Sequence, residues 1–356
     1  MYELNKKLRK IVGYDPAAGT SKIILDANES PFNALDSFRD EIMTAVGNLK
    51  LNRYPDPYAT EVVTAFAKFY GLDEKYVTAG NGSDELISII ISCFLQKGDK
   101  ILTLSPDFSM YAFYSKLYET NVTIMPKDEI YNTFSVGKII EQCNNNDIKA
   151  VIFSNPCNPT SLGIKREEII RLIKNVFCLV VIDEAYMDFW DQSILQEIED
   201  FDNVIVLKTL SKAFGAAGIR LGFAVSNEVV TGALRAAKSP YNTDLFSQEI
   251  GRIILSHPDE AAKNIAYIKA SRERLQEELT ELSRIYPCLD KVYDSQTNFV
   301  FIKTSKGLAI YEKLLERGIS IRYMGIYIRI TAGTREENEE LLTALREILK
   351  ELCDTD

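Results

Sequence analysis

The sequence predicts an α/β protein in which a mainly parallel sheet is covered by helices on both faces, followed by a smaller α+β domain. Short apolar runs alternate with helix-like segments between about residues 76 and 226. These runs lack the alternation of polar and apolar residues that marks a strand with one wet face, so we expect a three-layer arrangement. The predicted strands are 100–104, 122–125, 150–154, 178–183, 204–207 and 221–225.

The residues before this region predict an arm followed by two helices. Residues 1–30 are polar and show no periodicity, so we expect an irregular N-terminal arm. Segments 34–49 and 59–70 have the apolar spacing of helices, and the prolines within 52–57 force an extended loop between them. Between the predicted strands, the same spacing predicts helices at 84–96 and 165–175.

After residue 240 the pattern changes to long, charge-rich helical stretches and short strands. We therefore divide the chain into the arm 1–30, a large domain 31–240 and a small domain 241–356. The small domain is predicted to contain two helices within 245–284, helices at 306–317 and from residue 336, and strands at 298–303, 319–322 and 326–331.

Composition and charge exclude several function classes. The 356 residues are 46% hydrophobic and 26% charged, as in ordinary globular proteins. The net charge of −10 repels a phosphate backbone, so we expect no nucleic-acid partner. His257 is the only histidine, which excludes a His-based zinc site and a Ser-His-Asp triad. We therefore expect no metal, and acid–base chemistry must use lysine, tyrosine or a carboxylate.

The sequence also predicts a cytoplasmic protein without a membrane partner. Its apolar stretches are too short to cross a bilayer, and its first residues lack the apolar core of a secretory signal. None of the six cysteines forms a C-x-x-C pair, and unpaired thiols are typical of a reducing compartment.

Lys212 is the first candidate catalytic residue. It belongs to the segment 209–215, which directly follows an apolar strand, and it stands next to Ser211 and precedes Arg220 by eight residues. A partly desolvated lysine there could form a Schiff base with an aldehyde cofactor, while Ser211 and Arg220 could hold a phosphate group of that cofactor. The alternative is an exposed Ser-Lys pair before a glycine-rich turn.

Asp183 stands at the end of another apolar run and is followed by Glu184 and Tyr186. A carboxylate at a strand end can pair with a protonated ring nitrogen, the arrangement by which pyridoxal phosphate becomes an electron sink. Tyr186 could then donate to the phenolic oxygen of the same ring. The alternatives are a strand cap or a metal-binding Asp183–Glu184 pair.

Two further segments carry polar groups next to predicted strands. Asn158 lies in a turn fixed by two prolines and could direct its amide at the same ring oxygen, although a plain Asn-Pro turn is the alternative. Gly82 and Ser83 open a predicted helix, where free backbone N–H groups bind anions. The alternative for this second segment is simple helix capping.

Taken together, these segments resemble the fold-type I pyridoxal-phosphate aminotransferases of class I/II, and within them the histidinol-phosphate aminotransferase family. Segments 28–31, 53–55 and 329–334 extend the resemblance over nearly the whole chain. It implies that the large domain binds pyridoxal 5'-phosphate. The implied roles are cofactor attachment and proton transfer for Lys212, the ring nitrogen for Asp183, the ring oxygen for Asn158 and Tyr186, and the cofactor phosphate for Gly82, Ser83, Ser211 and Arg220.

The resemblance also implies residues that contact a face of the cofactor ring, the partner subunit and the substrate. Phe108 falls where an aromatic ring stacks on the cofactor. Tyr54 falls where a tyrosine reaches the cofactor phosphate of the neighbouring subunit, which implies a homodimer. The implied substrate contacts are Arg329 for a carboxylate, Arg322 for a second anion, and Tyr14 and Asn298 as lining residues; for Arg329, a structural ion pair is the alternative.

The sequence departs from the family pattern at two places. Ser161 stands where the family usually has glycine, so a slightly strained turn is expected. Only six residues separate Arg322 from Arg329, whereas the family usually has a longer excursion. Residues 323–326 therefore predict a tight hairpin that trims one wall of the substrate site.

The resulting prediction is a transaminase of amino-acid biosynthesis. It moves an amino group from a donor, expected to be glutamate, to a keto acceptor such as imidazole-acetol phosphate, the partner of histidinol phosphate. A decarboxylase of a phosphorylated amino acid, similar to threonine-phosphate decarboxylase, is the alternative. A regulator that binds the cofactor without turnover is disfavoured, because such proteins carry a DNA-binding module before the cofactor domain.

Overall fold

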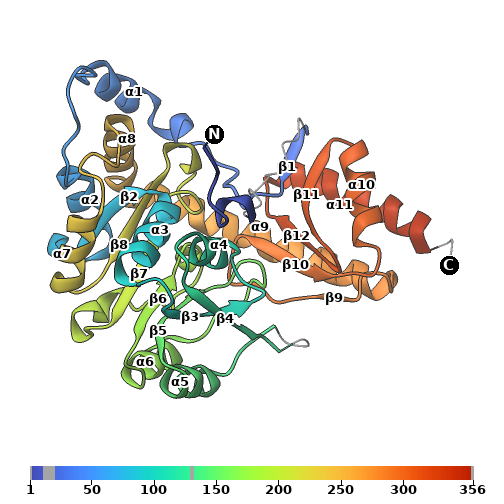
Figure 1. The fold of residues 1–356 in the computed structure, drawn as a ribbon. Helices are drawn as coiled ribbons and strands as arrows, with labels where there is room; N and C mark the ends of the chain where they lie inside the picture. The colour runs from blue at the N-terminus through green and yellow to red at the C-terminus, as the bar shows by residue number, and fades with distance from the viewer. Residues whose placement is uncertain (1, 11–20, 129–131, 354–356) are drawn as a thin grey trace.

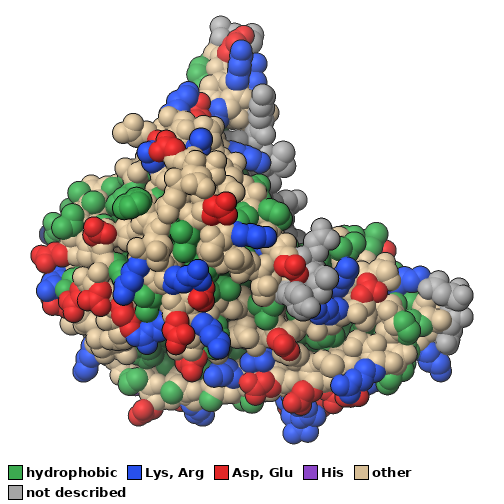
Figure 2. Space-filling model, turned by 90° about the horizontal axis from the view of Figure 1, so that it is seen from below, with side chains coloured by type: hydrophobic (Ala, Val, Ile, Leu, Met, Phe, Trp, Pro, Cys, Tyr) green, Lys and Arg blue, Asp and Glu red, His purple; other side chains and the backbone are tan. Residues whose placement is uncertain are grey.

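The computed structural model describes residues 2–10, 21–128 and 132–353. Two bodies, each built on its own sheet, lie side by side (Figure 1). Strand β1 (Ile23–Leu25) belongs to the smaller body, and the chain continues from it into the larger one. Acidic and basic side chains are interspersed over the face drawn in Figure 2. Within the described ranges, no helix is long and apolar enough to cross a membrane.

The larger body contains a seven-stranded sheet in the order β2-β8-β7-β6-β5-β3-β4. Strands β3 to β7 are parallel, and only β8 runs against its two neighbours. The expected mainly parallel sheet is therefore confirmed. The strands are β2 Val77–Asn81, β3 Lys100–Ser105, β4 Asn121–Pro126, β5 Ile148–Ser154, β6 Leu179–Asp183, β7 Val204–Thr209 and β8 Leu221–Val225.

Both faces of this sheet are buried, because neighbouring residues of one strand enter different cores. In β5, for example, Ile152 packs in the cluster that includes α3, whereas Val151 and Phe153 pack in the opposite cluster. This explains why the strands read as continuous apolar runs. The first face carries α3 Gly82–Phe94, α4 Met110–Leu117 and α7 Glu228–Ala237; the second carries α2 Thr60–Tyr70, α5 Val136–Asn145, α6 Arg166–Lys174 and α8 Leu245–Leu255, with α1 Ala34–Gly47 against α8.

The smaller body is a five-stranded sheet in the order β1-β11-β12-β10-β9. Its edge strand β1 (Ile23–Leu25) pairs in parallel with β11, so the expectation of an irregular arm is wrong for these three residues. Apolar side chains of β1 enter the core of the small sheet, and that burial fixes the pairing. The other elements are β9 Lys291–Val292, β10 Phe299–Lys303, β11 Ile319–Met324, β12 Tyr327–Thr331, α10 Gly307–Glu316 and α11 Arg335–Cys353.

Helix α9 (Pro258–Ile285) connects the two bodies. Its early residue Ile268 packs in the core of the large sheet, whereas Leu275 and Leu279 pack in the core of the small one. Helix α8 also lies against the large body, through α1 and α2. The division of the chain at residue 240 stays a prediction.

Candidate active site

A cavity of about 660 Å³ lies between the carboxyl ends of β5, β6 and β7 and the β11–β12 hairpin. Its size is typical of a site for a small molecule, and the carboxyl ends of parallel strands are where such sites form. Most of the predicted site residues line it: Ser83, Phe108, Asn158, Asp183, Tyr186, Ser211, Lys212, Arg220, Arg322 and Arg329.

Lys212 enters the cavity from the turn after β7. Its Nζ donates a hydrogen bond to the backbone oxygen of Ala27, 2.9 Å away. Burial lowers the pKa of Lys212 to about 8, and the positive charges of Arg329 and Arg220 act in the same direction. The amine is thus closer to its neutral, nucleophilic form than an exposed lysine would be.

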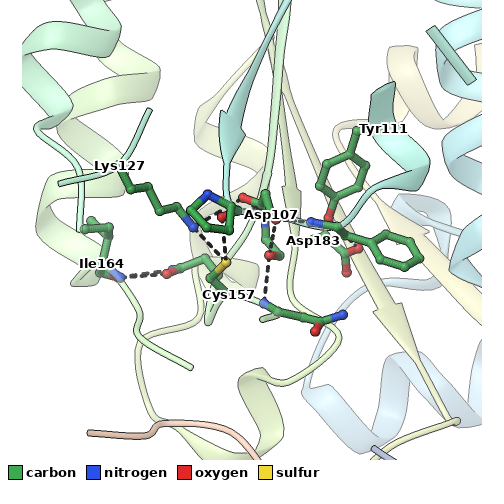
Figure 3. Close-up of polar contacts among 11 residues, drawn as sticks. Asp107, Tyr111, Lys127, Cys157, Ile164 and Asp183 are labelled. Atoms are coloured by element: carbon green, nitrogen blue, oxygen red, sulfur yellow. Dashed lines mark hydrogen bonds and ion pairs between the residues drawn. The ribbon is translucent and has the colours of Figure 1, made fainter. Parts of the chain in front are cut away.

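Asp183 ends β6 at the floor of the cavity and is 4% exposed. Its Oδ1 accepts from the backbone N–H of Ala185 at 3.1 Å, and its Oδ2 accepts from the Tyr111 hydroxyl at 2.8 Å (Figure 3). Burial raises the pKa of Asp183 to about 6, although both hydrogen bonds favour the ionised form. A cation in the cavity would complete the stabilisation of this carboxylate.

Tyr186 presents its hydroxyl to the cavity in a defined orientation. Nδ2 of Asn28 donates to the Tyr186 hydroxyl oxygen at 2.8 Å, so the hydroxyl hydrogen must point to another acceptor. Asn28 itself is buried, has a left-handed backbone with φ 55°, and donates its N–H to Oγ1 of Thr331. Burial raises the pKa of Tyr186 to about 12, so the phenol remains a donor at neutral pH.

Arg329, on strand β12 of the small body, holds Asn158 by a hydrogen bond. Nη1 of Arg329 donates to Oδ1 of Asn158 at 2.5 Å, and Nη2 donates to the backbone oxygen of Asp26 at 2.5 Å. With its amide oxygen used in this way, Asn158 has its NH₂ group to offer to the cavity. The same turn contains Ser161, whose φ of 63° confirms the expected strain.

The two arginines of the small body lie directly opposite each other in the sheet. Arg322 pairs with Arg329 and Met324 pairs with Tyr327, so a two-residue turn closes the hairpin. The predicted tight hairpin is confirmed. Directly paired residues of antiparallel strands place their side chains on one face, and both arginines accordingly line the cavity.

The start of α3 forms a narrow cradle beside Arg220. Gly82 has φ 75°, and a Cβ there would lie 3.0 Å from Nη2 of Arg220. A Cβ on Gly222 would lie 2.3 Å from the backbone nitrogen of Ser83, so β8 closely approaches this helix end. The side chain of Asn81, the N-cap residue, makes no capping hydrogen bond. The cradle thus combines free helix N–H groups with a guanidinium, as an anion site requires.

Two predicted residues lie elsewhere in the described structure. Asn298 is fully buried behind the cavity and donates to the backbone oxygen of Asn28 at 3.1 Å. Tyr54 is 79% exposed outside the cavity and stacks on Tyr241, with ring centroids 4.5 Å apart. Tyr14 lies outside the described residues.

Comparison with known proteins assigns the family. The sequence matches the family "Aminotransferase class I and II" over residues 20–345. The chain belongs to this aminotransferase family. The histidinol-phosphate aminotransferase of Clostridium novyi (strain NT) is 40% identical over 346 residues, 96% of either chain. That of Pyrococcus furiosus is 34% identical over 349 residues, 96% of this aminotransferase and 98% of the relative.

Solved structures share the fold of this aminotransferase. The histidinol-phosphate aminotransferase of Sinorhizobium meliloti, in complex with pyridoxal-5'-phosphate, superposes with a TM-score of 0.88 at 22% identity and 99% coverage of both chains. The L-threonine-O-3-phosphate decarboxylase of Porphyromonas gingivalis has a TM-score of 0.77 at 22% identity, over 92% of this chain and 99% of the other. At such identities the likeness concerns the fold, and the predicted fold class is confirmed.

The residues around the cavity fit pyridoxal phosphate. The glycine cradle at α3 leaves space for a phosphate group, which a Cβ at Gly82 would narrow. Asp183 provides a buried anion for a protonated ring nitrogen, and Lys212 provides an amine for an aldehyde. Among the described residues, no group of three or more His, Cys, Asp or Glu side chains is arranged to hold a metal ion.

Sequence reasoning missed the supporting residues of this aminotransferase. Tyr111 and Asn28 act by holding Asp183 and Tyr186, and neither carries a chemical signature of its own in the sequence. One signal was present: Tyr111 lies three residues after Phe108, and a tyrosine that is buried needs a hydrogen-bond partner.

Proposed function

We propose that this aminotransferase uses pyridoxal 5'-phosphate to transfer an amino group between histidinol phosphate and a keto acid, with glutamate as the physiological donor. The observation that carries the proposal is the pairing of Arg322 with Arg329 on the cavity face of the hairpin. Two guanidinium groups in one cavity favour a substrate with a phosphate or a carboxylate. The names of the relatives at 34–40% identity support the same substrate class.

The chain's own residues divide the work of this reaction. When bound, pyridoxal phosphate supplies a ring that withdraws electrons from the reacting carbon. Lys212, whose pKa burial lowers to about 8, is the group proposed to take up and return the proton at that carbon. Asp183 holds a protonated ring nitrogen, and its negative charge is favoured by the Tyr111 hydroxyl.

The ring oxygen and the phosphate have separate partners. The Tyr186 hydroxyl and the Asn158 amide each have a hydrogen to donate to the ring oxygen, because Asn28 and Arg329 occupy their acceptor atoms. Phe108 lines the cavity beside these groups and offers an aromatic face to the ring. The phosphate is assigned to the α3 cradle with Gly82, Ser83, Ser211 and Arg220.

We further propose a homodimer in which Tyr54 serves the neighbouring subunit. Its ring is largely exposed and stacks on Tyr241, so the tyrosine is ordered yet unused by its own cavity. Leu51 and Tyr58 are also exposed nearby in the chain, as expected for a surface that a second copy covers. We place the enzyme in the cytoplasm, since its six cysteines are thiols.

Substrate choice is tested with purified holoenzyme. Histidinol phosphate with 2-oxoglutarate should give glutamate, whereas unphosphorylated histidinol should react poorly. Arg322→Ala should raise the KM for histidinol phosphate roughly ten- to hundredfold, because a charged hydrogen bond contributes about 1.5–3 kcal/mol. Arg346→Ala, an exposed arginine paired with Glu278 away from the cavity, is the matched control and should change nothing.

Two results would contradict this assignment. Release of carbon dioxide from a phosphorylated amino acid, without amino transfer, would establish the decarboxylase alternative. Equal loss of activity toward phosphorylated and unphosphorylated substrates in Arg322→Ala would show that this arginine does not read the phosphate.

A further inference from the structure

A buried ion pair lies at the wall of the cavity. Lys127 follows β4, and its Nζ lies 3.6 Å from Oδ2 of Asp107; both side chains are 1% exposed (Figure 3). Asp107 lines the cavity, whereas Lys127 stands behind it. The positive charge of Lys127 is therefore separated from the proposed cofactor site by the side chain of Asp107.

Lys127 is held in place by contacts besides the ion pair. Its backbone N–H donates to the oxygen of Ser105 at 2.8 Å, and its Nζ lies 2.7 Å from Sγ of Cys157. Burial lowers the pKa of Lys127, but the Cys157 sulfur and the Asp107 carboxylate raise it more, so the net shift is upward. The amine stays charged, and a buried charge of this kind needs its partner.

Asp107 transmits this restraint to two residues that face the proposed ring. Its Oδ1 accepts from the backbone N–H of Phe108 at 2.8 Å and from the Ser154 hydroxyl at 2.5 Å. The Ser154 hydroxyl oxygen in turn accepts from the backbone N–H of Asn158 at 3.1 Å. The Asp107 carboxylate thus holds Phe108, which is expected to stack on the cofactor ring, directly. Through Ser154 it also holds Asn158, which is expected at the ring oxygen.

We infer that Lys127 and Asp107 form a positioning pair that sets the placement of Phe108 and Asn158, and thereby the affinity for pyridoxal phosphate and the acidity of its ring oxygen. The inference rests on the proposed function. Neither residue takes part in bond making. Burial raises the pKa of Asp107, and the positive charge of Lys127 opposes that shift and favours the ionised carboxylate, which can accept from Phe108 and Ser154 at once.

The test compares Lys127→Met, Asp107→Asn and the double variant. Lys127→Met leaves an unpaired buried carboxylate and should raise the cofactor dissociation constant at least about tenfold, as for a broken buried pair. The double variant keeps the Oδ1 acceptor without any charge and should return to within about threefold of wild type. Fluorescence titration of the cofactor-free protein measures these constants.

A spectroscopic readout separates positioning from general stability. A weakened Asn158 hydrogen bond no longer favours the ionised ring oxygen, so the pH midpoint of the visible cofactor band should rise by about half a unit in Lys127→Met. Lys208→Met is the matched control: Lys208 is also buried, with Nζ 3.0 Å from Oδ1 of Asp188, but does not line the cavity. It should lower the melting temperature and leave the midpoint unchanged.

The outcomes are distinguishable from failure of the proposed function. If wild-type protein gives no visible cofactor band, the proposed function fails. If wild type binds the cofactor, two results would overturn the inference. One is that Lys127→Met and Lys208→Met have the same cofactor dissociation constant and the same pH midpoint. The other is that the double variant binds the cofactor no more tightly than Lys127→Met does. If Lys127→Met does not fold, the cofactor dissociation constants of Asp107→Asn and of the double variant provide the same comparison.

Discussion

At the residue scale, the buried carboxylate of Asp183 links function to stability. Its pKa is raised to about 6 by burial, against 3.8 for an ordinary aspartate. A raised carboxylate pKa means that the folded state holds the proton more tightly. Its stabilising contribution is therefore complete below about pH 4 and is lost as the pH rises through 6.

Cofactor-free Asp183→Asn should consequently be more stable than the cofactor-free wild type at pH 8. The shift of about two pKa units corresponds to at most about 3 kcal/mol, and the difference should shrink between pH 7 and pH 4. Glu184, whose pKa burial raises to about 7, is present in both proteins and cancels in the comparison. Urea midpoints across this range provide the measurement, and a variant less stable at every pH would refute the account.

The residues proposed to carry the chemistry could be picked out in the sequence, whereas those that support them could not. Lys212 and Asp183 could be found because a lysine or aspartate at the end of an apolar run has few structural uses. Asn28 and Tyr111 contribute through partners distant in sequence, Tyr186 and Asp183. Asn298 shows the reverse: it was expected in the cavity, and the structure places it one layer behind, against Asn28.

At the scale of elements, the approach of β8 to the start of α3 leaves no room for a side chain. Gly222→Ala would place a Cβ 2.3 Å from the backbone nitrogen of Ser83, and neither backbone can yield without moving the helix end. We expect a loss of about 1–3 kcal/mol of stability from overpacking, together with weaker cofactor binding at the displaced N–H groups.

Gly232→Ala is the control for this substitution. Gly232 lies within α7, and a Cβ there meets nothing within 4 Å, so alanine should stabilise the helix by about 0.5–1 kcal/mol. Thermal melting and cofactor titration of both variants check the prediction. Unchanged cofactor affinity in Gly222→Ala would mean that the α3 cradle does not hold the phosphate.

Strands were predictable where burial on both faces left a continuous apolar run, as in β8, for which the predicted and observed bounds agree. Three strands were not predicted: β1, β2 and the two-residue β9. Strand β2 contains Gly80 and Asn81 and reads as the loop before α3, although it pairs with β8 across five residues. Strand β1 has three residues, and its pairing depends on β11 at the other end of the sequence.

At the scale of the whole molecule, the proposed dimer predicts complementation between two inactive variants. A Lys212→Ala subunit lacks the amine proposed to be catalytic, and a Tyr54→Ala subunit lacks the residue assigned to its partner's phosphate site. In a mixed dimer, one site combines an intact Lys212 with an intact Tyr54 from the other chain. Mixing the two variants should therefore restore activity, up to half of wild type for each mixed dimer.

The mass of the wild-type protein in solution should be measured by sedimentation alongside this experiment. A variant mixture that regains no activity, although mixed dimers form, would show that Tyr54 does not act across subunits. A fully active monomer would remove the dimer from the proposal altogether.

The parallel pairing of β1 with β11 determines when the site can be completed during synthesis. All strands of the large sheet lie between residues 77 and 225, so they leave the ribosome long before residue 319, the first of β11. At roughly 5–20 residues per second, about 5 to 20 seconds separate the last large-sheet strand from β11. Until then β1 has no partner, and the segment Asp26–Glu29, which lines the cavity, is not anchored at its N-terminal end. Completion of the cavity wall is thus a late event in the synthesis of this protein.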